Sequence, residues 1–166
     1  MRRLVLGALC GLGLVAGPVQ AQEVTFTTQT LTPESALMAA QHALESCRDS
    51  GYQVAVAVTD RAGVPLAVLR DRYAGAHTPE TATRKAFTAA SFNMDTTTLA
   101  RETQADQAAS GIRHVNQVLA LGGGLPISAA GSLVGAIGVS GAPGAEADDG
   151  CAQAGIDSIQ DELDFG

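Results

Sequence analysis

The sequence has no tryptophan, and aromatic residues make up only 4% of its 166 residues. Hydrophobic residues still reach 46%, and many are alanine, so a core built of small side chains and closely packed elements is expected. Basic residues are also scarce, with 10 Lys and Arg against 17 Asp and Glu. No face rich in Lys or Arg can be formed, which argues against nucleic-acid binding. The length fits one domain better than two.

The motifs of several common sites are absent as well. Gly124 is followed by Leu-Pro, where a phosphate-binding P-loop needs Lys-Ser or Lys-Thr. The GAIGVSG stretch has neither the dinucleotide-binding spacing nor a GxSxG nucleophile elbow. No HExxH or paired CxxC occurs, and His42, His77 and His114 are far apart in the sequence, so the metal question stays open. The glycines of 119–141 are therefore expected to permit tight turns and close approach of the backbone, rather than to bind a phosphate or a nucleotide.

Residues 1–21 have the pattern of a secretory signal peptide. Two arginines precede an apolar run that is too short to span a bilayer, and Val-Gln-Ala fits the small-residue pattern before a cleavage point. We expect cleavage between Ala21 and Gln22, which leaves one domain over 22–166, periplasmic or secreted, with no further membrane span. An uncleaved membrane anchor is the alternative, and the export route stays open.

Two cysteines remain after this cleavage. Cys10 leaves with the signal peptide, whereas Cys47 and Cys151 stay in the mature chain. An oxidising compartment favours a disulfide, and two buried free thiols are the alternative.

Local signals predict an α+β domain in the order helix, hairpin, helix, hairpin, helix. Thr-Pro-Glu at 32–34 and again at 78–80 begins a helix, and Gly51 ends the first one. Turn residues and alternating apolar residues mark the two hairpins. The strands are expected at 54–58, 64–69, 126–129 and 133–139, the last helix at 145–163, a short helix within 95–110, and a further strand at 115–121.

The first helix is predicted to be amphipathic. Leu37, Ala40, Leu44 and Cys47 recur at helical spacing and form one apolar stripe, whereas His42 falls on the opposite, polar side. The first strand alternates valine with alanine, so both of its faces are expected to be covered.

Four phrases resemble the GlcG/HbpS family of haem-binding proteins: VAVAVTDRAG, RKAFTAASF, LALGGGLPI and GSLVGAIGVSGAPGAEADDGCAQAGI. The resemblance covers about Leu31 to Leu163, and GGGLPI followed by GAIGVSG is its most distinctive part. It implies a profilin-like α+β fold, in which an antiparallel sheet is flanked by helices. It also implies a homo-oligomer and haem binding, with iron binding or a sensor partner in some relatives. Terminal helices can pack together in such a fold, so a Cys47–Cys151 disulfide is expected.

Two histidines are the haem-ligand candidates under this resemblance. His42 would suit a haem held at an oligomer interface, and His77, just before the second helix, could also bind an anionic group with the helix N-terminus. Lys85 could pair with a propionate. The alternatives are a solvated His42, a His77 that only begins the helix, and a structural or solvated Lys85.

Three functions follow from these observations. The first is haem binding, with haem or iron sensing or handling as the role that it would serve. The second is an accessory factor or enzyme acting on a small organic acid or oxidised metabolite, and the third is an assembly role. No nucleophile–base pair is visible, which argues against an enzyme. However, Asp60, Arg70, His77 and Lys85 could converge in a cleft, and a pocket joining His77, Lys85 and Gly122-Gly123-Gly124 would favour the second.

Overall fold

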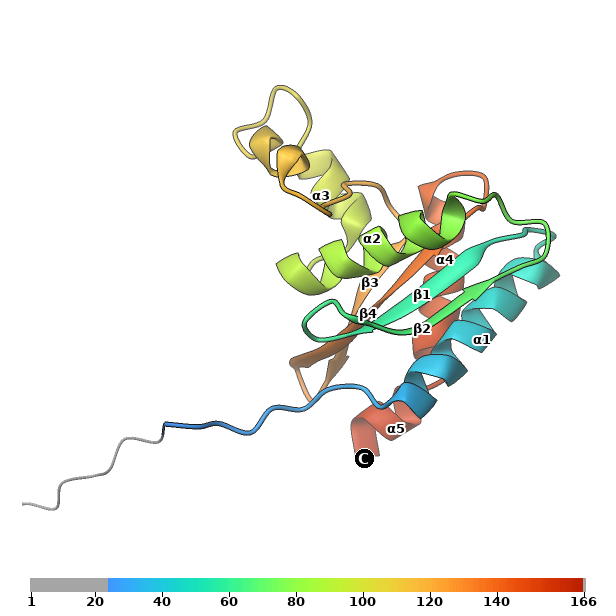
Figure 1. The fold of residues 1–166 in the computed structure, drawn as a ribbon, viewed down its shortest axis with the longest axis vertical. Coiled ribbons are helices and arrows are strands. Elements are labelled where there is room, and N and C mark those ends of the chain that lie inside the picture. Colours follow the sequence, from blue (N-terminus) through green and yellow to red (C-terminus); the bar gives the residue numbers. More distant parts are fainter. Residues whose placement is uncertain (1–23, 166) are drawn as a thin grey trace, which may run out of the picture.

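The computed structural model describes residues 24–165, so the predicted signal peptide lies outside the described residues. Its centre is one antiparallel sheet with the strand order β2-β1-β4-β3 (Figure 1). None of the helices described in this range is long and apolar enough to cross a membrane. The strands are β1 (Ala55–Asp60), β2 (Pro65–Arg70), β3 (Gly124–Ala129) and β4 (Ser132–Ser140).

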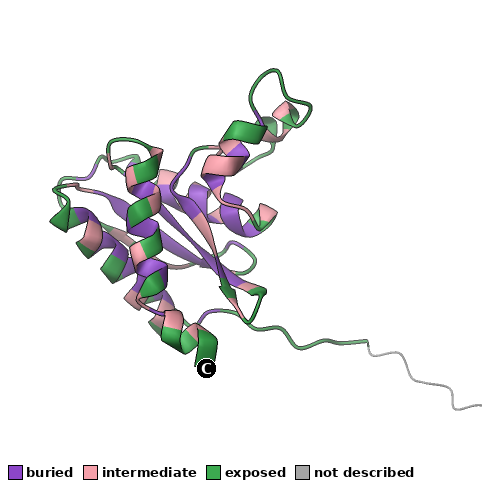
Figure 2. Ribbon diagram, turned by 180° about the vertical axis from the view of Figure 1, so that it is seen from behind, coloured by how far each residue is buried: buried purple, intermediate pink, exposed green. Residues whose placement is uncertain are grey.

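Helices cover both faces of the sheet, which confirms the α+β prediction. α1 and α4 pack against each other on one face, and α2 lies along the other (Figures 1 and 2). The helices are α1 (Pro33–Asp49), α2 (Thr78–Phe92), α3 (Thr96–Glu102), the 3-10 helix η1 (Ser110–His114), α4 (Ala145–Asp157) and α5 (Gln160–Phe165).

The central strand β1 is buried on both faces, as its alternating sequence predicts. Val56 and Val58 belong to the main core under α1 and α4, whereas Ala55 and Ala57 face α2. Small residues let α2 lie close to the sheet: a Cβ on Gly138 of β4 would stand 2.7 Å from the backbone nitrogen of Ala86.

The buried stripe of α1 differs in one position from the predicted one. Leu37 is 42% exposed, and alanines fill the contact instead. α1 packs against both the sheet and α4, so its contact surface is broad and consists of small side chains. The buried residues of α1 are Ala36, Ala39, Ala40, Ala43, Leu44 and Cys47.

Two further expectations were wrong. Residues 115–121 form no strand; after η1 they run as a loop whose carbonyls at Gln117 and Val118 accept hydrogen bonds from Arg84 of α2. The apolar character of this stretch reflects the buried Val118 rather than strand pairing. The last helix also ends earlier than predicted. α4 stops at Asp157, a turn brings the buried Ile159 into the core, and the separate α5 follows.

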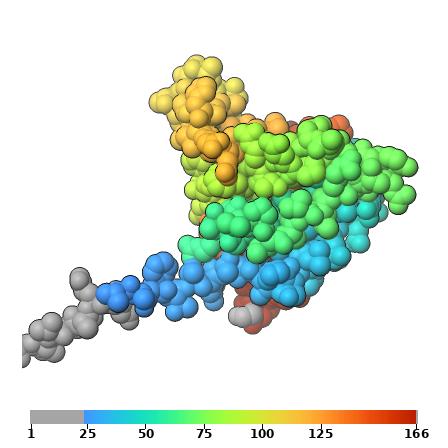
Figure 3. Space-filling view, viewed as in Figure 1, coloured from blue at the N-terminus to red at the C-terminus, as the bar shows by residue number. Residues whose placement is uncertain are grey.

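The segment from α3 to η1 projects from the body of the protein. It forms the protrusion at the top of Figure 3, and most of residues 104–117 are exposed. Arg113 holds it together, because its guanidinium donates to the carbonyls of Thr103 and Ala100 at 2.6 Å each.

Candidate functional site

A cavity of about 600 Å³ lies at one edge of the sheet. Its size falls in the range of small-molecule sites. The topology explains its position. β2 and β4 both run antiparallel to β1 and are therefore parallel to each other, and each leads into a helix on a different face. The first turns of α2 and α4 thus meet beyond the same ends of the strands, and both contribute to the cavity lining.

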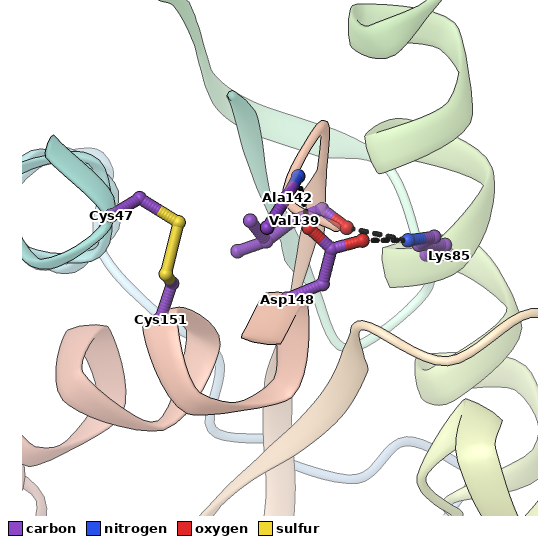
Figure 4. Close-up of a disulfide and its surroundings, with 6 residues drawn as sticks. All are labelled: Cys47, Lys85, Val139, Ala142, Asp148 and Cys151. Carbon is purple, nitrogen blue, oxygen red and sulfur yellow. Dashed lines mark hydrogen bonds and ion pairs between the residues drawn. A yellow bond between two sulfur atoms is a disulfide. The ribbon is translucent and has the colours of Figure 1, made fainter. Parts of the chain in front are cut away.

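A buried ion pair forms one wall of the cavity. Lys85, on α2, is only 1% exposed, and its Nζ donates to Oδ2 of Asp148 at 2.7 Å and to the carbonyl of Val139 at 2.8 Å (Figure 4). The other carboxylate oxygen of Asp148 accepts the Ala142 N–H at 3.0 Å. Burial raises the pKa of Asp148, and the bond from Lys85 offsets only part of this effect. The pair therefore ties α2, β4 and α4 together.

The triple-glycine loop closes over this pair. Gly123 has φ +111°, and a Cβ there would stand 2.7 Å from Nζ of Lys85 and 2.7 Å from Cβ of Asp148. Its N–H donates to Oδ1 of Asp149 at 2.6 Å. Gly122 lines the cavity, while Gly124 begins β3 and lies against the backbone of Lys85. The glycines permit close backbone approach, as the sequence predicted.

The predicted disulfide fixes α4 beside the site. Cys47 of α1 and Cys151 of α4 are bonded, with their Cα atoms 5.5 Å apart, and both residues are buried. Figure 4 shows the bond next to the Lys85–Asp148 pair, because Cys151 follows Asp148 by less than one helical turn. The disulfide therefore holds the middle of α4 against α1.

His77 stands at the mouth of the cavity. It occupies the N-cap position of α2, is exposed, and lines the cavity together with Lys85 and Gly122. Two exposed side chains with large apolar surfaces lie at the same mouth: Tyr73 is 80% exposed and Leu121 is 47% exposed. Three of the candidates from different parts of the sequence are thus brought together.

The other candidates lie elsewhere. Asp60 is at the far end of β1, where its Oδ1 accepts the N–H groups of Ala62 and Val64 at 2.8 and 2.9 Å and shapes the hairpin turn. Arg70 donates to the carbonyl of Ala74 and does not line the cavity. The expected convergence of these two residues with Lys85 was therefore wrong. Asp60 lies at the opposite ends of the strands, whereas Arg70 lies at the cavity end of β2 but its guanidinium is bonded to the nearby loop instead.

His42 lies apart from the cavity on the exposed side of α1, as the helical spacing predicts. Its Nδ1 is 3.9 Å from Oε2 of Glu45. Within residues 24–165, no group of three or more His, Cys, Asp or Glu side chains is placed to hold a metal ion.

Three lining residues, Asp148, Ser140 and Gln53, were not among the candidates from the sequence. The adjacent acids Asp148 and Asp149, at the beginning of the helix that follows the glycine-rich strand, are a signal that could have pointed to this position.

Comparisons with known proteins agree with this geometry. The family model described as "Haem degrading protein HbpS-like" matches residues 31–157. A solved double mutant of HbpS from Streptomyces reticuli is 39% identical, with a TM-score of 0.78, and the match covers 87% of this chain and 97% of that one. Klebsiella pneumoniae ORFY is 27% identical, with a TM-score of 0.81, over 84% and 97% of the two chains.

A third solved structure, described as a PduOC–haem complex, is 28% identical, with a TM-score of 0.74, over 78% of this chain and 95% of that one. No curated protein matches the chain. The family model spans most of the chain and ends at the last residue of α4, so it includes the whole sheet, the Lys85–Asp148 pair and the disulfide. The chain belongs to the HbpS-like family.

Proposed function

We propose that this protein binds haem. The observation that carries the proposal is the position of His77, an exposed imidazole at the mouth of the 600 Å³ cavity of an HbpS-like protein. The description of the related PduOC structure as a haem complex supports it. Imidazole is a common axial ligand of haem iron, and ligation leaves a characteristic absorption spectrum.

The residues at the mouth suit the parts of a haem. His77 would hold the iron, while Tyr73 and Leu121 offer exposed surface to the ring. The N-termini of α2 and α4, neither of which has a side-chain cap, favour an anionic group such as a propionate. Haem supplies a redox-active iron when it is bound. His42 is the second ligand candidate; because it lies on an open helix face, it would need a second copy of the chain to enclose the haem.

The proposal includes an exported homo-oligomer that handles or senses haem or iron. The buried Cys47–Cys151 disulfide supports an oxidising compartment, in agreement with the signal-peptide pattern. The projecting segment from α3 to η1 offers surface for contacts between copies.

A haem titration of the mature protein tests this function, with His77→Ala and His42→Ala as matched variants. We expect a saturable Soret shift at micromolar haem for wild type and His42→Ala, and its loss in His77→Ala with an unchanged circular dichroism spectrum. A wild-type protein without a saturable shift would refute haem binding. Loss of the shift in His42→Ala alone would move the ligand to α1.

The cavity also favours a second candidate function, an accessory factor or enzyme acting on a small organic acid. Its lining joins His77, Lys85 and Gly122, the combination that distinguishes this function from haem binding alone. Saturable binding of a short carboxylic acid to haem-free protein would support it.

A further inference from the structure

The N-terminal arm, residues 24–30, extends away from the body of the protein with its apolar side chains in solvent (Figure 1). Val24 is 94% exposed and Phe26 is 86% exposed, although both side chains are apolar. The sequence of the arm, VTFTTQT, has no charge, glycine or proline and is rich in residues that favour strands. The arm therefore has the composition of a β-strand but no neighbouring strand.

The backbone of the arm is unpaired as well. Between Thr25 and Thr30, no N–H or carbonyl is bonded to the backbone of another residue within 24–165. The first such bond is made by Leu31, whose N–H donates to the carbonyl of Val134 at 3.0 Å. Extended segments with unpaired backbone groups readily pair with another chain. Both the backbone and the apolar side chains of the arm thus lack a partner in their own copy.

The base of the arm is held in place, which fixes the side that its apolar residues present. The Thr30 hydroxyl donates to a carbonyl of β4 at 3.2 Å and accepts the Arg61 N–H at 3.4 Å, and the Arg61 guanidinium donates to the Thr28 hydroxyl. Side chains alternate along an extended chain, so Val24 and Phe26 lie on the same side as Thr28 and Thr30. This side faces the body at the base of the arm and runs past the body beyond it.

A groove of about 460 Å³ lies beside the base of the arm. It is bounded by residues 28–32, by the turn between β3 and β4, and by α5. Its volume falls in the range that encloses small molecules, so it has room for a phenylalanine and a valine side chain. The apolar residues in its lining are Leu31, Ala129, Val134, Ile159 and Leu163.

The arm cannot fill the groove of its own copy. Residues 28–32 form one wall of that groove, so residues 24–27 would have to reverse direction sharply. They include no glycine, proline, asparagine or aspartate, the residues that favour tight turns. With cleavage at the expected point, only Gln22 and Glu23 precede the arm, and two residues are too few to turn back and cover the groove.

The rim of the groove narrows the choice of occupant. Glu162 and Asp164 contribute to the lining and are exposed, so the rim repels the phosphates of nucleic acids and of anionic membranes. An uncharged, extended segment with apolar side chains suits the apolar lining. The arm is such a segment, and a second copy of the chain brings an arm and a groove together.

We propose that the arm of each copy lies in the groove of a second copy, with Val24 and Phe26 against its apolar lining. The contact then occurs twice about a two-fold axis, because each copy supplies one arm and one groove. This inference rests on the homo-oligomer proposed above, for which it names a contact, and it is independent of haem binding.

The mass of the assembly in solution is the first test. In sedimentation at micromolar concentration, the mature Val24→Ser, Phe26→Ser protein should have half the wild-type mass or less, because a contact that joins copies in pairs is lost. Its circular dichroism spectrum should be unchanged, since both side chains are exposed. The control is Val64→Ser, Val68→Ser, which replaces two exposed valines outside the groove and should keep the wild-type mass.

Cross-linking between two single variants tests where the arm docks. Thr25→Cys protein, which keeps both apolar residues of the arm, is mixed with Glu162→Cys protein under mild oxidation. We expect a disulfide between the two variants on a non-reducing gel, which can form only between copies. Glu80→Cys is the matched control, because Glu80 is also an exposed acid but lies on α2, outside the groove. It should not be linked to Thr25→Cys.

The other outcomes separate this contact from the homo-oligomer. An arm variant with the wild-type mass would overturn the contact and leave the homo-oligomer intact, whereas a monomeric wild type would overturn both. A Thr25→Cys arm that links to Glu80→Cys, or only to a second Thr25→Cys arm, would overturn docking in the groove.

Discussion

Lys85 is the largest side chain that is fully buried in the described part of the chain, and its charge is balanced by Asp148. We predict that Lys85→Met destabilises the protein by about 3–5 kcal/mol, because an uncompensated carboxylate stays buried. Urea unfolding measures this loss. The double variant Lys85→Met, Asp148→Leu should recover most of it, since a buried ion pair is often replaceable by apolar residues. A single variant as stable as wild type would show that the pair contributes nothing.

Asp71 should make stability depend on pH in the acid range. Arg48 donates to both of its carboxylate oxygens, at 2.7 and 3.0 Å, and these bonds hold the pKa of Asp71 below its usual value of 3.8. A lowered pKa stabilises the folded state above that value, and the contribution is lost as the pH falls below it. The stability difference between wild type and Asp71→Asn should therefore shrink from about pH 6 to about pH 3.

The comparison with Asp71→Asn isolates this group. Asp148 has a raised pKa, so its effect has the opposite sign: the folded state is favoured by protonation, and stability falls as the pH rises above 3.8. Because Asp148 is present in both proteins, its effect cancels in the difference. A difference that is constant with pH would contradict the role assigned to the Arg48–Asp71 pair.

At the level of single residues, the sequence predicted part of the site. His77 and Lys85 could be recognised because His77 precedes, and Lys85 lies within, a helix that begins with a clear Thr-Pro-Glu signal. Asp148, the partner of Lys85, could not be recognised, because it is 63 positions away in the sequence and only the fold brings the two side chains together. Asp60 was misassigned for a different reason: its partners are local, the backbone N–H groups of its own hairpin turn.

The disulfide joins α1 to α4 and should contribute a large part of the free energy of unfolding. It closes a loop with a sequence separation of 104 residues, for which the chain-entropy model gives about 4.7 kcal/mol. We predict that replacing Cys47 and Cys151 together by alanine costs about 2–5 kcal/mol in urea unfolding. Thiol counting of denatured, non-reduced wild-type protein should find no free thiol at either position. Two reactive thiols in exported protein would contradict the bond.

At the level of elements, local signals sufficed where the segment's own chemistry decided the outcome. Caps and turn residues located α1, α2 and both hairpins, and the alanine-rich strand revealed two covered faces. They failed at 115–121, where Val118 is buried and its carbonyl accepts a hydrogen bond from α2, but the segment does not pair as a strand. Burial by tertiary contacts and burial by strand pairing leave the same apolar pattern in a short segment.

For the whole molecule, the fold explains why the site lies where it does. Two successive hairpins each lead into a helix, and the two helices cover opposite faces, so both helix N-termini converge at one sheet edge. Adjacent to this edge, α4 is fixed to α1 by the disulfide and to α2 by the Lys85–Asp148 pair. A ligand there contacts groups from both halves of the chain, which gives its binding a direct link to folding stability.

The state of the mature chain is the last prediction, and it concerns residues 1–23, outside the described structure. We expect the exported protein to begin at Gln22, because Ala21 completes the small-residue cleavage pattern after a short apolar run. Intact-mass measurement of periplasmic protein should show the loss of residues 1–21. Ala21→Phe should block this loss, since a large residue directly before the cut does not fit the signal peptidase, whereas Gln29→Phe, outside the cleavage pattern, should not. A wild-type mass that still includes residues 1–21 would show an uncleaved anchor instead, and the disulfide would then need an oxidising compartment reached by another route.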